Sequence, residues 1–122
     1  MKIKIYVGKK MTTLSWIFLE NKISVRLPGF ADAKYSNERN IIVASSNIGL
    51  IYIIGIDGEI KYEFSNAENE NYKFYCLANT KYNDLGVNII MAHDPELNGE
   101  RFWQHTIDLE NQAVGEPLTK WR

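Results

Sequence analysis

Two histidines, His93 and His105, are the residues of this sequence best suited to acid–base chemistry. An imidazole gains and loses a proton near neutral pH, and two imidazoles beside a lysine would support metal-free cleavage of RNA. His93 begins a loop at His93-Asp94-Pro95, whereas His105 lies in an alternating segment, so no local spacing brings them together. One alternative is therefore a small enzyme or ligand-binding β-domain that uses His93 and His105 in a strand-end pocket. The other is a structural role for both.

The sequence contains no recognisable motif for metal binding or for nucleophilic catalysis. Cys76, His93, Asp94 and His105 are ligand types that zinc accepts, but their spacing matches no compact zinc pattern. Cys76 is the single cysteine, so it forms no intrachain disulfide, and the apolar run around it predicts a buried thiol. Ser45-Ser46 lacks the Gly-x-Ser-x-Gly context of a hydrolase, and the glycines form no phosphate-binding loop. We predict no catalytic residue, no metal site, no cofactor and no enzyme activity.

Acidic side chains concentrate in residues 57–70 and 94–100. On a surface they would attract a basic partner, and such complementarity raises association rates and selects partners. The alternative is that the acids only keep a strand-rich protein soluble and protect its edges. For the first alternative we predict a partner-binding set that joins acids to two neighbouring aromatic residues: Glu63, Glu68, Glu70, Tyr72, Asp94, Glu96, Glu100 and Trp103.

Charge is divided unevenly along a chain of 122 residues whose composition is that of an ordinary folded protein. Residues 1–40 hold eight Lys or Arg and three Asp or Glu, a net +5, and the remainder holds six and twelve, a net −6. The acidic part argues against nucleic acid as the main partner. The longest apolar run, Ile48 to Ile56, is about half a membrane span, and residues 1–10 do not look like a signal peptide. These features favour the cytoplasm and no membrane partner.

Alternation with a period of two residues dominates the sequence and predicts strands. Residues 3–7 read as a half-buried strand, and residues 14–19 and 23–27 as a hairpin that turns through Glu20-Asn21-Lys22. The clearest hairpin is Leu50 to Phe64, which turns at Asp57-Gly58. Its first strand, residues 50–54, is apolar on both faces, as expected for a strand between two layers.

Later segments complete an all-β prediction. Residues 72–78, 87–92 and 102–109 read as strands, with a turn at residues 109–112. Residues 28–40, with room for a short helical turn, and residues 65–71 read as surface loops. No boundary divides the chain, so residues 1–122 form one domain. We predict an antiparallel meander of hairpins that forms a sandwich, a small barrel or an incomplete propeller-like sheet array.

Residues 41–64 resemble one blade of a β-propeller. The resemblance rests on Ile42 to Asn47, Gly49 to Tyr52 and the Asp57-Gly58 hairpin, and residues 72–114 resemble a second blade more faintly. Propellers close with four or more blades of about forty residues, so this chain is too short for a complete one. A propeller-like structural module that associates with copies of itself to complete its sheet edges is therefore a further alternative.

In overall character the chain resembles the immunity proteins of contact-dependent growth inhibition and related polymorphic toxin systems. The resemblance rests on the small size, the β-strand character, the lack of a catalytic motif and the acidic segments 57–70 and 94–100. What it implies is one-to-one, high-affinity binding of a cognate toxin domain, often a nuclease, whose active site is thereby covered. It also implies a cytoplasmic protein that is a monomer or part of a 1:1 heterodimer.

Overall fold

A computed structural model describes residues 1–121 and contains eleven strands and no helix among them. The strands are β1 (Lys4–Val7), β2 (Met11–Phe18), β3 (Asn21–Pro28), β4 (Ala31–Ser36), β5 (Ile41–Ser46), β6 (Leu50–Gly55), β7 (Ile60–Ser65), β8 (Tyr72–Asn79), β9 (Val87–Leu97), β10 (Glu100–Asp108) and β11 (Ala113–Lys120). They form three antiparallel meanders: an N-terminal sheet (β1–β3), a middle sheet (β4–β7) and a C-terminal sheet (β8–β11). The predicted all-β antiparallel meander is confirmed. Within residues 1–121 there is accordingly no helical segment that could cross a membrane.

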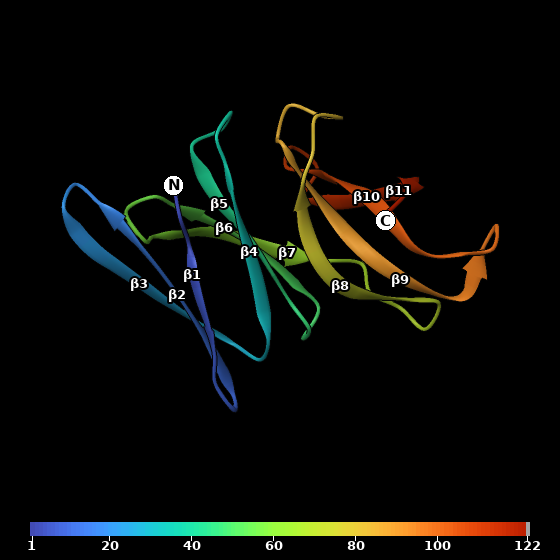
Figure 1. Ribbon diagram of the computed structural model, residues 1–122, viewed down its shortest axis with the longest axis horizontal. Coiled ribbons are helices and arrows are strands. Elements are labelled where there is room, and N and C mark those ends of the chain that lie inside the picture. The colour runs from blue at the N-terminus through green and yellow to red at the C-terminus, as the bar shows by residue number, and fades with distance from the viewer. Residues whose placement is uncertain (122) are drawn as a thin grey trace.

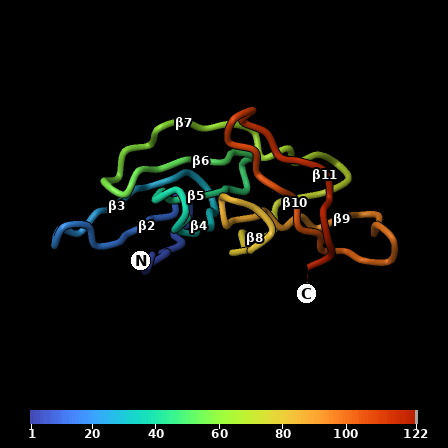
Figure 2. Tube along the Cα trace, turned by 90° about the horizontal axis from the view of Figure 1, so that it is seen from above, coloured from blue at the N-terminus to red at the C-terminus, as the bar shows by residue number. Residues whose placement is uncertain are grey.

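The three sheets stand side by side along the long axis of the molecule (Figure 1). Their first strands β1, β4 and β8 follow one another along one edge, while β7 lies at the opposite edge (Figure 2). Contacts between β1 and β4, between β4 and β8, and between β7 and β11 connect the sheets at these edges. None of the sheets closes into a barrel among the described residues, so the small-barrel alternative does not apply. Stacked open sheets match the sandwich and sheet-array alternatives.

The middle sheet is buried on both faces because it packs against both of its neighbours. Alternate residues of β6 enter different clusters: Tyr52 and Ile54 pack with the N-terminal sheet, and Ile51 and Ile53 with the C-terminal sheet. This confirms the prediction that residues 50–54 form a strand between two layers. The two outer sheets each bury only one face in this way.

Hydrogen bonds of two side chains, Thr12 and Trp16, attach the N-terminal sheet to the middle sheet. The Thr12 hydroxyl donates to the Gly29 carbonyl oxygen at 2.7 Å and accepts from the Ala31 N–H at 3.0 Å. Trp16, 3% exposed, donates its Nε1–H to the Ile56 carbonyl oxygen at 2.7 Å. The ring supplies apolar contact area, and the hydrogen bond satisfies its one polar atom.

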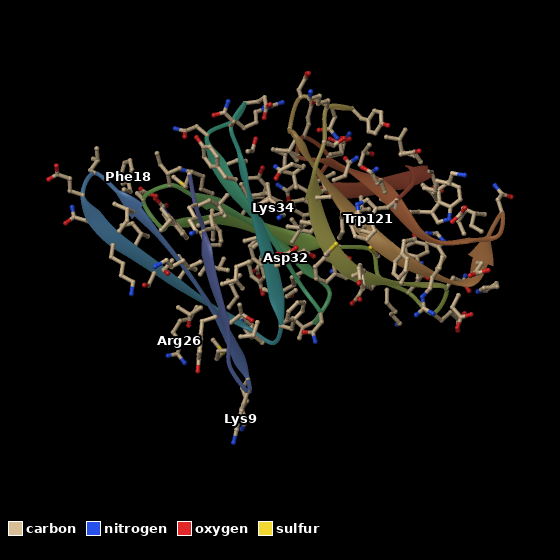
Figure 3. The ribbon with its side chains drawn as sticks, in the orientation of Figure 1. Lys9, Phe18, Arg26, Asp32, Lys34 and Trp121 are labelled. Carbon is tan, nitrogen blue, oxygen red and sulfur yellow. The ribbon has the colours of Figure 1, made fainter. Side chains whose placement is uncertain are left out.

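The C-terminal sheet is attached through β4. Asp32 accepts a hydrogen bond from the backbone N–H of Leu77 at 2.9 Å, and the Ser36 hydroxyl donates to the Leu85 carbonyl oxygen at 2.6 Å. Figure 3 shows Asp32 near the centre of the molecule. The contacts of the middle sheet therefore place the C-terminal sheet, which holds most of the predicted binding residues.

Several predicted turns and connections agree with the structure. Asp57-Gly58 joins β6 to β7, and Gly58 has a φ of 93° that a side chain would oppose. A Cβ on Gly58 would also lie 2.7 Å from the Ile23 side chain of the N-terminal sheet. The predicted turn at residues 109–112 and the predicted irregular connection at residues 65–71 are likewise present. Each of these turns and connections is specified by residues close together in the chain, so it can be predicted from the sequence.

Three details of the strand predictions are wrong. β1 is exposed along its length rather than half-buried, because the cluster beneath the sheet is filled from β2 and β3. The β2–β3 turn is Leu19-Glu20, with φ of 49° and 68°, so Asn21 is already in a strand. Residues 28–40 are not simply a surface loop, because they contain β4, whose alanines are small enough for close packing between sheets.

Candidate functional site

The structure brings the two histidines together. Tyr72 opens β8 opposite His93 of β9, and His105 of β10 lies on the same face of the sheet. The His93 Nε2 and His105 Nε2 atoms are 2.9 Å apart. The Tyr72 ring stacks on both imidazoles, with ring centroids 4.8 Å from His93 and 5.1 Å from His105.

Hydrogen bonding dictates how the histidine pair holds its protons. The His105 Nδ1 lies 2.9 Å from the Gly115 carbonyl oxygen, which can only accept, so this nitrogen carries a proton and donates. In the neutral pair the His105 Nε2 then accepts, and the His93 Nε2–H donates to it. Two fully protonated rings would point N–H groups at each other across 2.9 Å. The geometry therefore excludes a doubly charged pair.

Burial reinforces this preference for neutral rings. It lowers the pKa of His93 below its usual value, and it is also the largest cause of the lowered pKa of His105. The nearby His93 lowers the pKa of His105 further, whereas the Gly115 carbonyl and Glu116 oppose the shift. The neutral, hydrogen-bonded pair is the stable form at neutral pH.

Access limits what the histidine pair can do chemically. His93 is 7% exposed and His105 is fully buried. Acid–base catalysis needs a substrate within hydrogen-bonding reach of the imidazole. The geometry is that of a buried polar contact between strands.

The predicted binding residues gather at one end of the C-terminal sheet, with one exception. The 66–71 connection and the β9–β10 hairpin lie side by side, because the Asp94 N–H donates to the Asn71 carbonyl oxygen at 2.8 Å. The Trp103 Nε1–H donates to the Glu100 carbonyl oxygen at 3.0 Å, and its ring meets His93 edge-on at 6.4 Å. We call this group the acidic end: Glu68, Glu70, Tyr72, Asp94, Glu96, Glu100 and Trp103.

The five acids of the acidic end differ in how they are held. Glu70, Asp94 and Glu96 are exposed. Glu68 is half-buried and accepts the backbone N–H of Phe74 at 2.7 Å, and Glu100 forms an ion pair with Lys120 at 3.7 Å. The three exposed carboxylates are therefore the ones best placed to meet a partner, while the other two already hold parts of the fold.

Glu63 is not part of this group. It pairs with Tyr52 across β6 and β7, and Tyr52 belongs to the cluster beneath the N-terminal sheet. Its neighbour Phe64 points the other way, toward the C-terminal sheet. Side chains alternate along a strand, so Glu63 lies on the face of the middle sheet that is turned away from the acidic end.

Sequence reasoning missed an aromatic cluster on the outward face of the C-terminal sheet. The ring centroids of Tyr75 and Phe102 are 4.6 Å apart, and Trp121 lies 5.9 Å from Tyr75 and 6.2 Å from Phe102. A register shift between Phe74 and Cys76 breaks the alternation of β8 at Tyr75, which is 49% exposed. Trp121 is close to the end of the sequence, and its ring partners come from the distant strands β8 and β10.

Cys76 is partly rather than fully buried, and its thiol is protonated at neutral pH. Burial, aided by Asp32 and opposed by Lys34, raises the pKa of its thiol to about 11. The reactive form is the thiolate, so this group stays protonated and inert. Among residues 1–121 no three His, Cys, Asp or Glu side chains are placed to share a metal ion.

Two open depressions of about 600 and 700 Å³ lie between the middle and C-terminal sheets. The first is lined by residues that include Arg39, Tyr62 and Asp84, and the second by residues that include Tyr35 and Glu38. Both are wide and mixed in polarity, without the enclosed apolar walls that hold small ligands. Neither contains a residue of the acidic end.

Comparison with known proteins found no match to a protein-family model, to a curated protein or to a solved structure. Function must therefore be inferred from the surfaces of this chain.

Proposed function

We propose that the protein is a stoichiometric inhibitor that binds a basic surface of another protein through its acidic end, as an immunity protein binds a cognate toxin. The observation that carries this proposal is the meeting of the 66–71 connection with the β9–β10 hairpin. Acids from two distant segments thereby lie at the same end of the sheet as Trp103, whose ring is half-buried and whose Nε1–H donates to the Glu100 carbonyl oxygen. A charged rim around an aromatic residue is the usual composition of a protein-binding site.

The chemistry of the acidic end suggests the kind of partner. Nuclease active sites are basic because they bind phosphates, so carboxylates at the positions of Glu70, Asp94 and Glu96 would occupy such a site in place of nucleic acid. Trp103 would add contact area, since its one polar atom is already satisfied by the Glu100 carbonyl oxygen. The proposal includes a cytoplasmic monomer that forms a 1:1 complex with its toxin.

The test begins with a pull-down of tagged protein from its native cell extract, with low-salt and high-salt washes and mass spectrometry. A toxin domain recovered in equal amount is then purified, and its association rate is measured with the variant E70K/D94K/E96K. We expect association to slow at least ~10-fold, because steering by complementary charge accounts for factors of this size or more.

A matched control separates this surface from total charge. The variant E20K/D84K/E110K makes the same change in charge at exposed positions outside the acidic end. It should associate at close to the wild-type rate. Equal slowing by both variants, or by neither, would remove the acidic end from the proposal.

Self-association is a second candidate, and the aromatic cluster of Tyr75, Phe102 and Trp121 favours it. The middle sheet shows that a sheet of this fold can be covered on both faces, yet the outward face of the C-terminal sheet carries half-exposed rings. Light scattering over a range of concentrations tests this candidate. A mass that rises toward twice 14.1 kDa, and that falls back in Tyr75→Ser, would support it, and a constant monomer mass would oppose it.

The enzyme alternative needs His93 and His105 to lie together in an accessible pocket, and only their proximity is observed. His93 and His105 do meet, but their contact is buried, so a substrate has little access to either ring. We therefore place no reaction at the pair, and the binding proposal does not use its chemistry.

A further inference from the structure

The outward face of the N-terminal sheet carries cationic side chains on both of its outer strands, β1 and β3. Strand register places Lys4 of β1 beside Ser15 and Ser24, and Arg26 of β3 beside Thr13. On β2 and β3 the residues between these positions, Leu14 and Val25, point inward into the cluster around Trp16. The outward face therefore has a middle column of hydroxyl groups with cations on both sides.

The cations of this sheet have no acidic partners. Residues 1–28 contain six Lys or Arg and one acid, Glu20, which lies in the β2–β3 turn. Within the part of the chain that the structure describes, no carboxylate comes within 4.0 Å of any of the six nitrogens. Lys9 and Arg26 project away from the body of the molecule, and Trp121 marks the opposite end (Figure 3). We call this surface the basic face: Lys2, Lys4, Lys9, Lys10, Lys22 and Arg26.

Two shallow depressions lie on the basic face, one toward each end. The first, of about 290 Å³, is lined by Lys2, Lys4 and Lys22 together with Ser15 and Ile17. The second, of about 340 Å³, is lined by Lys9, Lys10 and Arg26 together with Tyr6 and Thr13. Each therefore combines three cations with a hydroxyl group and an apolar side chain.

We propose that the basic face binds single-stranded nucleic acid. Its Lys and Arg side chains would neutralise phosphates, the Thr13 and Ser15 hydroxyls would bond phosphate oxygens, and the Tyr6 ring would stack on a base. Tyr6 is 72% exposed, so its ring is available for stacking without any rearrangement of the core. From Lys22 to Arg26 the face extends about 13 Å along β3, enough for more than one nucleotide.

The composition of the basic face favours nucleic acid over an acidic protein. Lysine is depleted at protein–protein interfaces, whereas clustered lysine and arginine are the signature of phosphate binding. An exposed aromatic ring among the cations matches the stacking platforms of single-strand binders. The expectation against nucleic acid rests on the acidic part of the chain, residues 41–122, and none of these residues belongs to the N-terminal sheet.

Fluorescence anisotropy with a labelled oligonucleotide of twenty thymidines tests the proposal on the full chain. Six phosphate contacts predict a slope of log affinity against log salt near −4, which is about a 300-fold loss of affinity between 50 and 200 mM NaCl. Lys4→Gln with Arg26→Gln should make the slope shallower by about 1.4. Lys61→Gln with Lys81→Gln, at exposed positions in β7 and in the β8–β9 connection, should leave it unchanged.

Tyr6→Leu separates stacking from charge. We expect it to weaken oligonucleotide binding about 5-fold or more with the salt slope kept, because a base stacked on an aromatic side chain contributes this much. Circular dichroism should show that the exposed-site variants keep the wild-type fold. Failure to bind at 50 mM NaCl, or equal losses in the test and control pairs, would overturn the proposal.

Two competitors cover the other polyanions. A peptide of twenty glutamates that competes as well as the oligonucleotide, with no effect of Tyr6→Leu, would reassign the face to an acidic protein. Binding to phosphatidylserine vesicles without oligonucleotide binding would reassign it to a membrane surface. None of these measurements involves the acidic end, so the inhibitor proposal stands or falls separately.

Discussion

Truncation of two adjacent isoleucines would test the three-layer arrangement directly. Ile53, 1% exposed, packs toward the C-terminal sheet, and Ile54, fully buried, packs toward the N-terminal sheet. If the middle sheet is covered on both faces, Ile53→Ala and Ile54→Ala should be costly to a similar extent. A sheet with one solvated face would make only one of them costly.

The size of the effect follows from burial. Each change removes the equivalent of three methylene groups, about 2.4 kcal/mol of transfer free energy at about 0.8 kcal/mol each. The cavity left in a packed core adds to this, so we expect each variant to lose about 2.5–4.5 kcal/mol of unfolding free energy. Ile60→Ala is the control, because Ile60 is 42% exposed at the start of β7 and should lose less than about 1 kcal/mol.

Urea unfolding followed by tryptophan fluorescence measures all three variants. Where an alanine variant fails to fold, Ile53→Val and Ile54→Val give the same comparison at about 0.5–1.5 kcal/mol each. A loss at Ile54 as small as that at Ile60, beside a large loss at Ile53, would refute packing of the N-terminal sheet on the middle sheet. The reverse result would refute packing of the C-terminal sheet.

Three further changes probe the contacts that place the sheets. Burial lowers the pKa values of His93 and His105 from 6.5, so the unfolded chain binds more protons than the folded protein does. The stability contributed by the neutral rings should therefore be complete above about pH 6.5 and decline as pH falls through the lowered pKa values. Urea midpoints measured between pH 7.5 and 5.5 should show this decline, and it should be much smaller in the variant with glutamine at both positions. An equal decline in that variant would show that other groups cause the pH dependence. Asp32→Ala leaves a β8 backbone N–H without its acceptor and should cost about 1–3 kcal/mol, with Asp32→Asn losing less; equal losses would exclude the hydrogen bond as the cause. Trp16→Phe removes a 2.7 Å hydrogen bond and should cost about 1–3 kcal/mol in the same assay, and a neutral result would show that this bond does not hold the N-terminal sheet.

The parts of the fold that were predictable are local in sequence. Asp57-Gly58 between an apolar and an alternating segment specifies a hairpin by itself, and an apolar run with no polar face requires cover on both sides. β4 was not predictable in this way, because its buried apolar residues are Ala31 and Ala33 and alanine is not a strong strand former. Their small size suits a strand packed closely between sheets, but how closely the sheets pack there depends on the other strands.

The candidate site shows a similar limit. The acids of residues 68–70 and 94–100 were identified from composition, but their proximity depends on the pairing of β8 with β9. Glu63 was grouped with them because it is close in sequence, and strand alternation turns it to the other face. The contact of His93 with His105 likewise depends on register across β9 and β10, which no spacing in the sequence reveals.

The charged groups of the two ends contribute little to holding the sheets together. The N-terminal sheet is attached by an apolar cluster and by hydrogen bonds of Thr12 and Trp16, and its six cations have no carboxylate partner within residues 1–121. Unpaired like charges on one small sheet repel each other, so they are neutral or unfavourable for folding. The exposed acids Glu70, Asp94 and Glu96 likewise lie outside both clusters. Charge can therefore be changed at either end without disturbing the core, so each binding proposal can be tested without loss of the fold.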